Sequence, residues 1–267
     1  MNSSGYNQDY AFIADLYDHV VPYANRPDVD FYVRAAEELG GPVLEVGCGT
    51  GRVLIPTAQS GLDIVGLDSS TSMLDVCRQS VSNEPEEVQA RIQLQEADMR
   101  DFNLGQLFKL ITIPFRPFQH LITVTDQLMC LGNIYQHLMD DGRLIFDVFN
   151  PSFETIVNDA YGEEIHDEPE FTAPDGRRVI RRHKIVSRDR ANQVTDVELI
   201  YYVTHPDGRE ERLVQAFPMR YLFRFEVEHL LGRCGFEVEH LYGDFDKSPF
   251  GSKYPGELIF VAKKVGH

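Results

Sequence analysis

The residues best suited to chemistry in this sequence are a glycine-rich segment and three acidic residues near it. Glu45 stands two residues before the segment 47–51, which reads Gly-Cys-Gly-Thr-Gly, and Asp68 and the pair Asp98-Met99 follow later in the chain. Glycines between a strand and a helix let a ligand approach the backbone and the helix N-terminus closely. An acid at the end of the next strand can accept both hydroxyls of a ribose. With Asp98 placed to bind an adenine amino group and Met99 to cover the ring, the pattern predicts a site for an adenosine-containing ligand.

The glycine spacing and Glu45 decide which adenosine-containing ligand is favoured. Dinucleotide-binding folds usually carry G-x-G-x-x-G, with the pyrophosphate at the helix N-terminus. Here the spacing is G-x-G-x-G, and the carboxylate of Glu45 precedes the first glycine by two residues. A carboxylate at this place would repel a pyrophosphate, but it suits an ammonium group or a sulfonium. The segment therefore favours a cationic ligand group over a dinucleotide.

The elements that position these residues follow an alternation of strands and helices. Helices are expected over 9–21, 28–39 and 125–139, the last one stopped by Asp141-Gly142. A further helix should follow the glycine segment and extend to about Gln59, strained by Pro56. Buried strands are expected over 43–46, 63–67, 92–96, 110–113 and 143–149. Strands and helices at this spacing predict parallel crossover units, and hence a doubly wound α/β sheet. Strands at 236–242 and 257–262, after a helix at 225–234, should complete it as a sheet of seven strands with the last one antiparallel.

From about 163 to 222 the pattern changes to alternating apolar residues interrupted by turns. Strands are expected over 179–187, 194–203 and up to Tyr221, and Pro206-Asp207-Gly208 is a strong hairpin signal. We therefore expect an antiparallel meander inserted into the α/β domain. The predicted organisation is an N-terminal helical cap (1–40), a ligand-binding α/β domain (41–155 and 223–267) and the inserted region (156–222).

Composition limits the classes of function. The chain has 267 residues and a formal net charge of −17, which disfavours general binding to nucleic acids or anionic membranes. The basic run at 177–184 lies on a predicted strand, where acidic residues of neighbouring strands can pair with it. No apolar run reaches the length of a membrane helix and no secretory signal is visible, so a cytoplasmic protein is expected. The four cysteines and nine histidines show no metal-binding spacing, and no metal is expected.

The segment 45–51, Asp68 at the next strand end and Asp98-Met99 after the third strand resemble the class I S-adenosylmethionine-dependent methyltransferases. The resemblance covers about 40–150 and 224–263. It implies S-adenosyl-L-methionine as the cofactor, with Glu45 and the glycine segment around its methionine part and Asp68 at its ribose. The further cofactor-contacting residues that it implies are Gly47, Cys48, Gly49, Gly51, Ser69, Met73, Asp98, Met99, Pro114 and Phe115.

Two N-terminal features are candidates for the same site. In similar methyltransferases an N-terminal tyrosine closes over the donor, so Tyr17 and Tyr23 are candidates for a gate, Tyr17 at the cofactor and Tyr23 toward the acceptor. Packing of an amphipathic helix is the alternative for each. Arg34 is a candidate for binding the donor carboxylate, with a solvated helix face as the alternative.

The acceptor side is less defined by the sequence. His120 follows the fourth strand, where the acceptor must lie, and is the candidate catalytic base; a loop histidine without a chemical role is the alternative. Arg116 could bind an acidic substrate group. The insertion resembles, more loosely, that of small-molecule methyltransferases such as those that N-methylate amino sugars, where it covers the acceptor and can contribute to a homodimer. Phe149, Tyr161 and Tyr221 are the remaining candidates for the acceptor pocket.

These observations predict a methyltransferase acting on nitrogen or oxygen of a small-molecule acceptor. Two alternatives come from other classes. A nicotinamide-dependent oxidoreductase is disfavoured by the glycine spacing and by Glu45. A non-catalytic protein that senses S-adenosylmethionine would bind the donor tightly without transferring its methyl group.

Overall fold

The computed structural model describes residues 11–20, 23, 26–158, 162–166 and 168–265 of the chain. Its larger sheet has seven strands in the order β10-β11-β5-β4-β1-β2-β3. Their bounds are β1 Val43–Val46, β2 Ile64–Asp68, β3 Ile92–Glu96, β4 Phe108–Ile113, β5 Leu138–Phe149, β10 Phe236–Tyr242 and β11 Glu257–Lys264. β1 to β5 pair in parallel, and β11 is antiparallel to both β5 and β10. The predicted seven-stranded sheet with its antiparallel last strand is confirmed.

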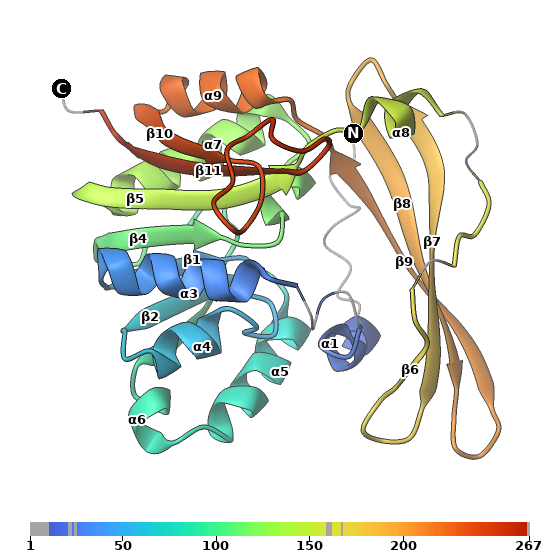
Figure 1. Ribbon diagram of the computed structural model, residues 1–267. Coiled ribbons are helices and arrows are strands. Elements are labelled where there is room, and N and C mark those ends of the chain that lie inside the picture. The colour runs from blue at the N-terminus through green and yellow to red at the C-terminus, as the bar shows by residue number, and fades with distance from the viewer. Residues whose placement is uncertain (1–10, 21–22, 24–25, 159–161, 167, 266–267) are drawn as a thin grey trace.

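Helices cover both faces of this sheet (Figure 1). The bounds on one face are α3 Asp28–Leu39, α4 Leu54–Gln59, α5 Thr71–Ser82 and α6 Glu86–Gln89, and those on the other are α7 Val124–His137 and α9 Arg224–Arg233. Each set closes a separate apolar core. Phe31 and Leu54 belong to the first core, while Ile134 and Leu231 belong to the second. Because successive strand residues point to opposite faces, β1 supplies Val43 to one core and Leu44 to the other.

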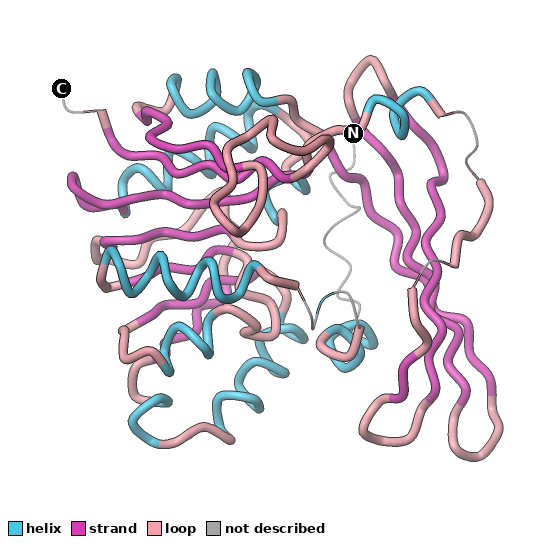
Figure 2. The backbone as a smooth tube through the Cα atoms, viewed as in Figure 1, coloured by secondary structure: helices cyan, strands magenta, loops and turns pink. Residues whose placement is uncertain are grey.

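A second, antiparallel sheet stands beside the strand ends of the first (Figures 1 and 2). Its order is β6-β7-β8-β9, with bounds β6 Phe171–Thr172, β7 Arg178–Asp189, β8 Val194–Thr204 and β9 Glu210–Arg220. The short helices α1 (Ala11–Tyr17) and α8 (Phe153–Val157) lie on the side of this sheet that faces the first. Ile13 and Leu16 of α1 form a third apolar core with residues of the second sheet such as Tyr201.

Two local expectations about the chain are wrong. The helix α7 ends at His137 rather than near Asp141, because Leu138 already pairs with Phe108 as the first residue of β5. Gly142 therefore stops no helix. It lies where a Cβ would come within 2.8 Å of the Lys109 carbonyl oxygen, so it allows β4 and β5 to approach closely.

Pro56 does not break α4, contrary to the expected strain. It is the third residue of the helix Leu54–Gln59, in the first turn, where a backbone N–H has no intrahelical partner. The missing N–H of proline therefore costs no helical hydrogen bond here.

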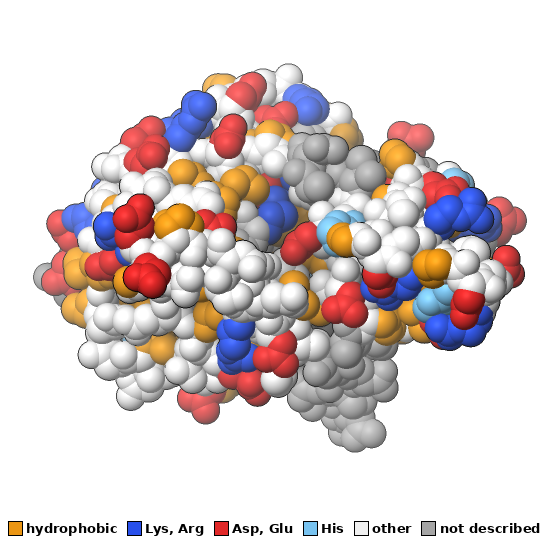
Figure 3. Space-filling model, turned by 90° about the horizontal axis from the view of Figure 1, so that it is seen from below, with side chains coloured by type: hydrophobic (Ala, Val, Ile, Leu, Met, Phe, Trp, Pro, Cys, Tyr) orange, Lys and Arg blue, Asp and Glu red, His pale blue; other side chains and the backbone are white. Residues whose placement is uncertain are grey.

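Among the described residues, no helix combines the length and apolar character that crossing a bilayer requires. Within the same residues there is no cluster of three or more His, Cys, Asp and Glu side chains that could hold a metal ion. On the face shown in Figure 3, Lys and Arg side chains mostly lie next to acidic ones. The basic run on β7 is paired in this way, for example Lys184 with Glu198 at 3.8 Å.

Candidate active site

A cavity of about 900 Å³ lies between the carboxyl ends of the parallel strands and the inner face of β7 to β9. Ligands bind at this edge in open α/β sheets because the loops that follow the strands converge there. A volume of this size is at the upper end of the range for small-molecule sites. It is sufficient for a cofactor and a small acceptor together.

The glycine segment forms the floor of the cavity directly after β1. Gly47 has φ +74°, and a Cβ on it would come within 2.8 Å of Pro117 Cγ, so only glycine fits. Gly49 has φ +54° and no heavy atom within 4 Å of its Cβ position, and it lines the cavity. Gly49 therefore leaves open the space in which a ligand can approach the backbone.

Glu45, in β1, presents to this cavity a carboxyl oxygen without a hydrogen-bond partner among the described residues. Its side chain is only 2% exposed, and its Oε2 atom has no hydrogen-bond partner in the described protein. Burial raises the pKa of this carboxyl from 4.5 to about 8, while Arg52 opposes the shift. Leaving a buried carboxyl oxygen unpaired is costly, and a cationic ligand group would remove that cost. This is the observation on which the fit of a sulfonium or ammonium group rests.

Asp68, at the end of β2, lies on the other side of the glycine segment. Its two carboxylate oxygens accept hydrogen bonds from the backbone N–H groups of Gly49 (2.8 Å) and Ser70 (2.9 Å). Burial raises its pKa, and these backbone hydrogen bonds act in the opposite direction. The carboxylate is thus held in place at the cavity wall, with Met73 and Met99 among the apolar side chains nearby.

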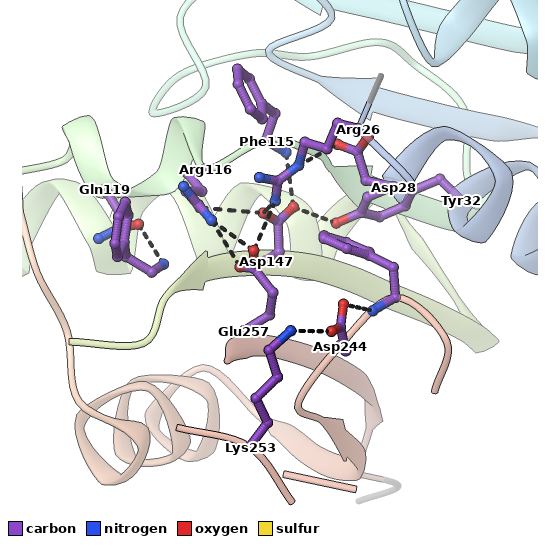
Figure 4. A network of polar contacts seen from close by, with 12 residues as sticks. Arg26, Asp28, Tyr32, Phe115, Arg116, Gln119, Asp147, Asp244, Lys253 and Glu257 are labelled. Carbon is purple, nitrogen blue, oxygen red and sulfur yellow. Dashed lines mark hydrogen bonds and ion pairs between the residues drawn. The ribbon is translucent and has the colours of Figure 1, made fainter. Parts of the chain in front are cut away.

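The loop after β4 is held in a strained conformation over the cavity. Phe115 (φ 66°) and Arg116 (φ 72°) both adopt left-handed backbone angles that non-glycine residues rarely take. The Phe115 N–H donates to Asp147 Oδ1 at 2.8 Å, which fixes the loop to the end of β5 (Figure 4). Arg26 donates to the same carboxylate at 3.1 Å, and Tyr32 donates to it at 2.7 Å. Asp147 is fully buried, so this network secures the loop from behind.

Tyr17 and Tyr23 stand with Phe115 in one aromatic cluster at the cavity. The ring centroids of the two tyrosines are 4.9 Å apart, and Tyr23 is 4.8 Å from Phe115. Tyr23 also accepts a hydrogen bond from Arg181 on β7. The N-terminal segment therefore contacts both the loop after β4 and the second sheet.

His120 and Phe149 line the acceptor side of the cavity. The His120 ring packs edge-on against Phe217 of β9 at 5.2 Å and hydrogen-bonds to the backbone of Pro218. Burial lowers the pKa of His120 to about 4, so the imidazole is neutral at pH 7. The backbone of Pro218 has a carbonyl oxygen but no N–H, so one ring nitrogen of His120 donates to it. In the neutral imidazole the other ring nitrogen is then a hydrogen-bond acceptor.

Several predicted residues lie elsewhere. Arg34 is exposed on α3 and does not line the cavity, so its assignment to the donor carboxylate is withdrawn. Asp98 is held by the guanidinium of Arg100, with Nε 2.9 Å from Oδ1, and lies outside the lining. Gly51 lines a separate, smaller depression.

Three residues predicted for the acceptor side are not confirmed in that role. Tyr221 is absent from the cavity lining among the described residues, and Tyr161 lies outside them. Arg116 lines the cavity, but its guanidinium donates to both carboxylate oxygens of Glu257, at 2.8 and 2.9 Å. Its charge is already compensated, so the assignment of Arg116 to an acidic substrate group is not supported.

Sequence reasoning missed several residues that line the cavity, most of them in or near the second sheet. These are Arg26, Arg52, Glu168, Arg181, His183, Gln215 and Phe217. The period-two pattern of β7 could have shown that Arg181 and His183 share a face, but not that this face turns toward the cavity. Only the docking of the two sheets decides that.

The chain is similar to known methyltransferases. Residues 43–142 match a family model described as a methyltransferase domain. The chain is 26% identical over 254 residues to the dTDP-3-amino-3,6-dideoxy-alpha-D-glucopyranose N,N-dimethyltransferase of Streptomyces fradiae, covering 90% of each chain. It is 27% identical over 227 residues to the cypemycin N-terminal methyltransferase of a Streptomyces species, covering 84% of each. The fold matches the CcbJ methyltransferase of Streptomyces caelestis with a TM-score of 0.76 at 22% identity, over 95% of this chain and 96% of that one.

Proposed function

We propose that this protein, a class I S-adenosylmethionine-dependent methyltransferase, methylates the nitrogen of a small-molecule amine. Two similar proteins are named for methylation at nitrogen, one on an amino sugar and one on an N-terminus. The cavity supports an amine as well, because the neutral imidazole of His120 lines it and can accept a hydrogen bond from an N–H group.

The chain's own residues fit the methyl donor. Glu45 and the backbone of Gly47 and Gly49 would hold the methionine part, and Asp68 would accept the ribose hydroxyls. Met73 and Met99 would cover the adenine. The bound donor supplies a methyl group on a sulfonium, which is transferred by in-line displacement. The protein's task is to align the acceptor nitrogen and to exclude water.

His120 would position the acceptor nitrogen rather than remove its proton. A catalytic base works best with a pKa near the operating pH, whereas burial holds that of His120 at about 4. A neutral imidazole can still accept a hydrogen bond from an amine N–H. This would turn the nitrogen lone pair toward the donor side of the cavity.

The observation that carries the proposal is the buried, unpartnered carboxyl oxygen of Glu45 at the glycine segment. The test is calorimetric titration of the purified protein with S-adenosylhomocysteine, NAD and ATP. We expect binding of the thioether alone, and at least about a tenfold loss of its affinity in Asp68→Ala. The matched control is Asp63→Ala, which removes an exposed acid just before the opposite end of β2.

Binding of NAD instead of S-adenosylhomocysteine would contradict the assignment of the donor site. If the thioether binds as expected, a screen of primary and secondary amines with S-adenosylmethionine tests the transfer step. A protein that binds the thioether but methylates only phenols or other hydroxyl acceptors would contradict the assignment to nitrogen.

A further inference from the structure

The charged groups around the cavity are already paired with one another. Four arginines line it, and each has a carboxylate partner: Arg26 and Arg52 pair with Asp28, Arg116 pairs with Glu257, and Arg181 pairs with Glu168. The four guanidinium groups are matched by four carboxylates, Asp28, Asp147, Glu168 and Glu257, of which only Glu168 lines the cavity itself. Glu45 and Asp68 also line the cavity. No lysine lines the cavity in the described part of the chain, and the residues outside that part contain neither Lys nor Arg.

This charge balance decides which acceptors can enter. A nucleoside diphosphate brings several negative charges, and proteins bind such groups with free guanidinium forks or with helix N-termini. Here each fork faces a carboxylate, as between Arg116 and Glu257 (Figure 4). An incoming phosphate would have to compete for Arg116 with this bidentate carboxylate, which also pairs with Arg26 at 3.5 Å, and would add negative charge beside it.

At α5 and α8, two helices that begin near the cavity, backbone N–H groups at the N-terminus already have partners. At α5 the Ser70 hydroxyl accepts from the Met73 N–H at 3.3 Å, and Asp68 accepts from the Ser70 N–H. At α8 the Phe153 N–H donates to the Tyr254 hydroxyl at 2.7 Å. These backbone donors are therefore already used.

The inner face of the second sheet presents an ordered acceptor wall. Ile185, Val197 and Phe217 pair across β7, β8 and β9 and so form an apolar row on one face. This row adjoins His120, whose ring contacts Phe217. The wall thus begins with hydrocarbon surface at the point where the acceptor nitrogen must lie.

The next rows of the same face become polar. His183, Leu199 and Gln215 pair across the same strands two residues further along, and Arg181 pairs with Tyr201 in the row beyond. The amide of Gln215 can donate to and accept from a neutral polar group. Arg181 is only 5% exposed and is neutralised by Glu168.

We propose that the acceptor is a phosphate-free amine, with an apolar body lying on the row Ile185–Val197–Phe217 and an uncharged polar group at Gln215. This inference rests on the proposed N-methyltransferase function. On this inference, the acceptor of this protein differs from that of the similar dTDP-amino-sugar enzyme. The methylated amino group can be the same, but the acceptor carries no nucleotide.

The first test asks whether carboxylate pairing excludes anions from the cavity. Protein saturated with S-adenosylhomocysteine is titrated with pyrophosphate and with thymidine 5′-diphosphate by calorimetry. We expect no saturable binding to the wild type. Glu168→Gln removes the carboxylate partner of Arg181, which keeps its contact with Tyr23, and should increase affinity for pyrophosphate by at least about tenfold. Glu164→Gln is the matched control, because Glu164 pairs with Arg212, on the opposite face of the same sheet.

Saturable binding of thymidine 5′-diphosphate to the wild type would overturn the inference. So would a folded Glu168→Gln variant that binds pyrophosphate no better than the control. If Glu168→Gln does not fold, Glu257→Gln makes the corresponding test at Arg116, which then keeps, among the described carboxylates, only the longer contact with Asp147 at 3.8 Å.

The second test compares one amino sugar in two forms, as a methyl glycoside and as its nucleoside diphosphate ester. We expect kcat/KM to be at least about tenfold higher for the glycoside. A preference for the nucleotide ester would overturn the inference while confirming amine methylation. If the protein methylates no amine, the proposed function fails, and the anion titration still decides whether the cavity excludes phosphates.

Discussion

At the scale of single residues, the site contains two ionisable side chains in which burial shifts the pKa so that the neutral form is favoured. Burial raises the pKa of Glu45 to about 8 and lowers that of His120 to about 4. In the donor-free protein both side chains are therefore neutral near pH 7. Glu45 gains its charge when a cationic group is placed beside it, which couples its ionisation to donor binding.

Replacing Glu45 with glutamine should stabilise the donor-free protein and weaken the binding of a sulfonium. The folded protein retains the Glu45 proton between pH 4.5 and about 8 while the unfolded chain loses it, so the wild type loses stability as pH rises through that window. We expect Glu45→Gln to be more stable by about 1–3 kcal/mol at pH 8 and little different near pH 4.5. Urea denaturation at both pH values measures this.

Calorimetry on the same variant should show at least about a tenfold loss of affinity for S-adenosylmethionine. Glu37→Gln, on the exposed side of α3, is the control for loss of an acidic side chain. Equal behaviour of the two variants would contradict the role of Glu45.

His120→Phe should reduce turnover without affecting donor binding. Phenylalanine keeps the contact with Phe217 but cannot accept a hydrogen bond from the amine. With an acceptor found in the amine screen, we expect kcat to fall at least about tenfold, with an unchanged Kd for S-adenosylhomocysteine. His166→Phe, at an exposed position, is the control.

The pH profile of the wild type gives an independent check on His120. Because its pKa is about 4, protonation of this ring should reduce kcat only below that range. An inflection of kcat near the ordinary histidine value that disappears in His120→Phe would show instead that His120 titrates as a base.

At the scale of elements, the site depends on loops whose shape is imposed by their neighbours. The loop after β4 takes two consecutive left-handed residues because Asp147, at the end of β5, binds its backbone. The loop after β1 takes left-handed angles at glycines instead, where no such restraint is needed. Both loops thus line the same cavity with left-handed residues, which are stabilised by a hydrogen bond to Asp147 in one loop and are glycines in the other.

Comparing the variants Gly49→Ala and Gly105→Ala distinguishes the effect of backbone strain from the effect of a methyl group placed in the cavity. Both glycines have positive φ (+54° and +65°) and neither has a heavy atom within 4 Å of its Cβ position. Each substitution should therefore cost about 1–2 kcal/mol of stability. Only Gly49 lines the cavity, so only its variant should lose at least about tenfold in S-adenosylhomocysteine affinity by calorimetry. Equal losses in both variants would contradict a donor site at Gly49.

At the scale of the whole molecule, the cavity joins two sheets that have separate apolar cores. The residues proposed to hold the donor belong to the seven-stranded sheet and its loops, and the proposed acceptor wall belongs to β7 to β9. Tyr23 connects the two sides through its contacts with Phe115 and Arg181. A ligand in the cavity should therefore stabilise the native arrangement of the entire chain.

S-adenosylhomocysteine at about 100 times its Kd should stabilise the folded protein by about 2.7 kcal/mol. For a chain of this size that corresponds to an increase in Tm of about 5–10 °C. Thermal unfolding followed by circular dichroism, with and without the thioether, measures the shift. Asp68→Ala should show little or no increase at the same concentration, and an equal increase would contradict the assigned donor site.

The donor side could be predicted from the sequence because its residues are tied to strand ends. Glu45, the glycine segment and Asp68 lie within β1 and β2 or directly after β1, and parallel strands bring their carboxyl ends to one edge. Local spacing thus determined both the fold class and the ligand class. Asp98 is an exception, because the nearby Arg100 binds its carboxylate.

The acceptor side was decided only by the tertiary structure. Arg26 pairs with the nearby Asp28, but Arg26 and Arg116 also pair with Asp147 and Glu257, which lie 121 and 141 residues away in the chain, and nothing in the sequence indicates those two pairings. The inward face of β7 likewise depends on how the second sheet docks beside the first. Periodicity shows which residues share a face of a strand, but which face is covered depends on packing between distant segments. The charge balance of the cavity, and with it the class of acceptor, is therefore a property of the folded chain.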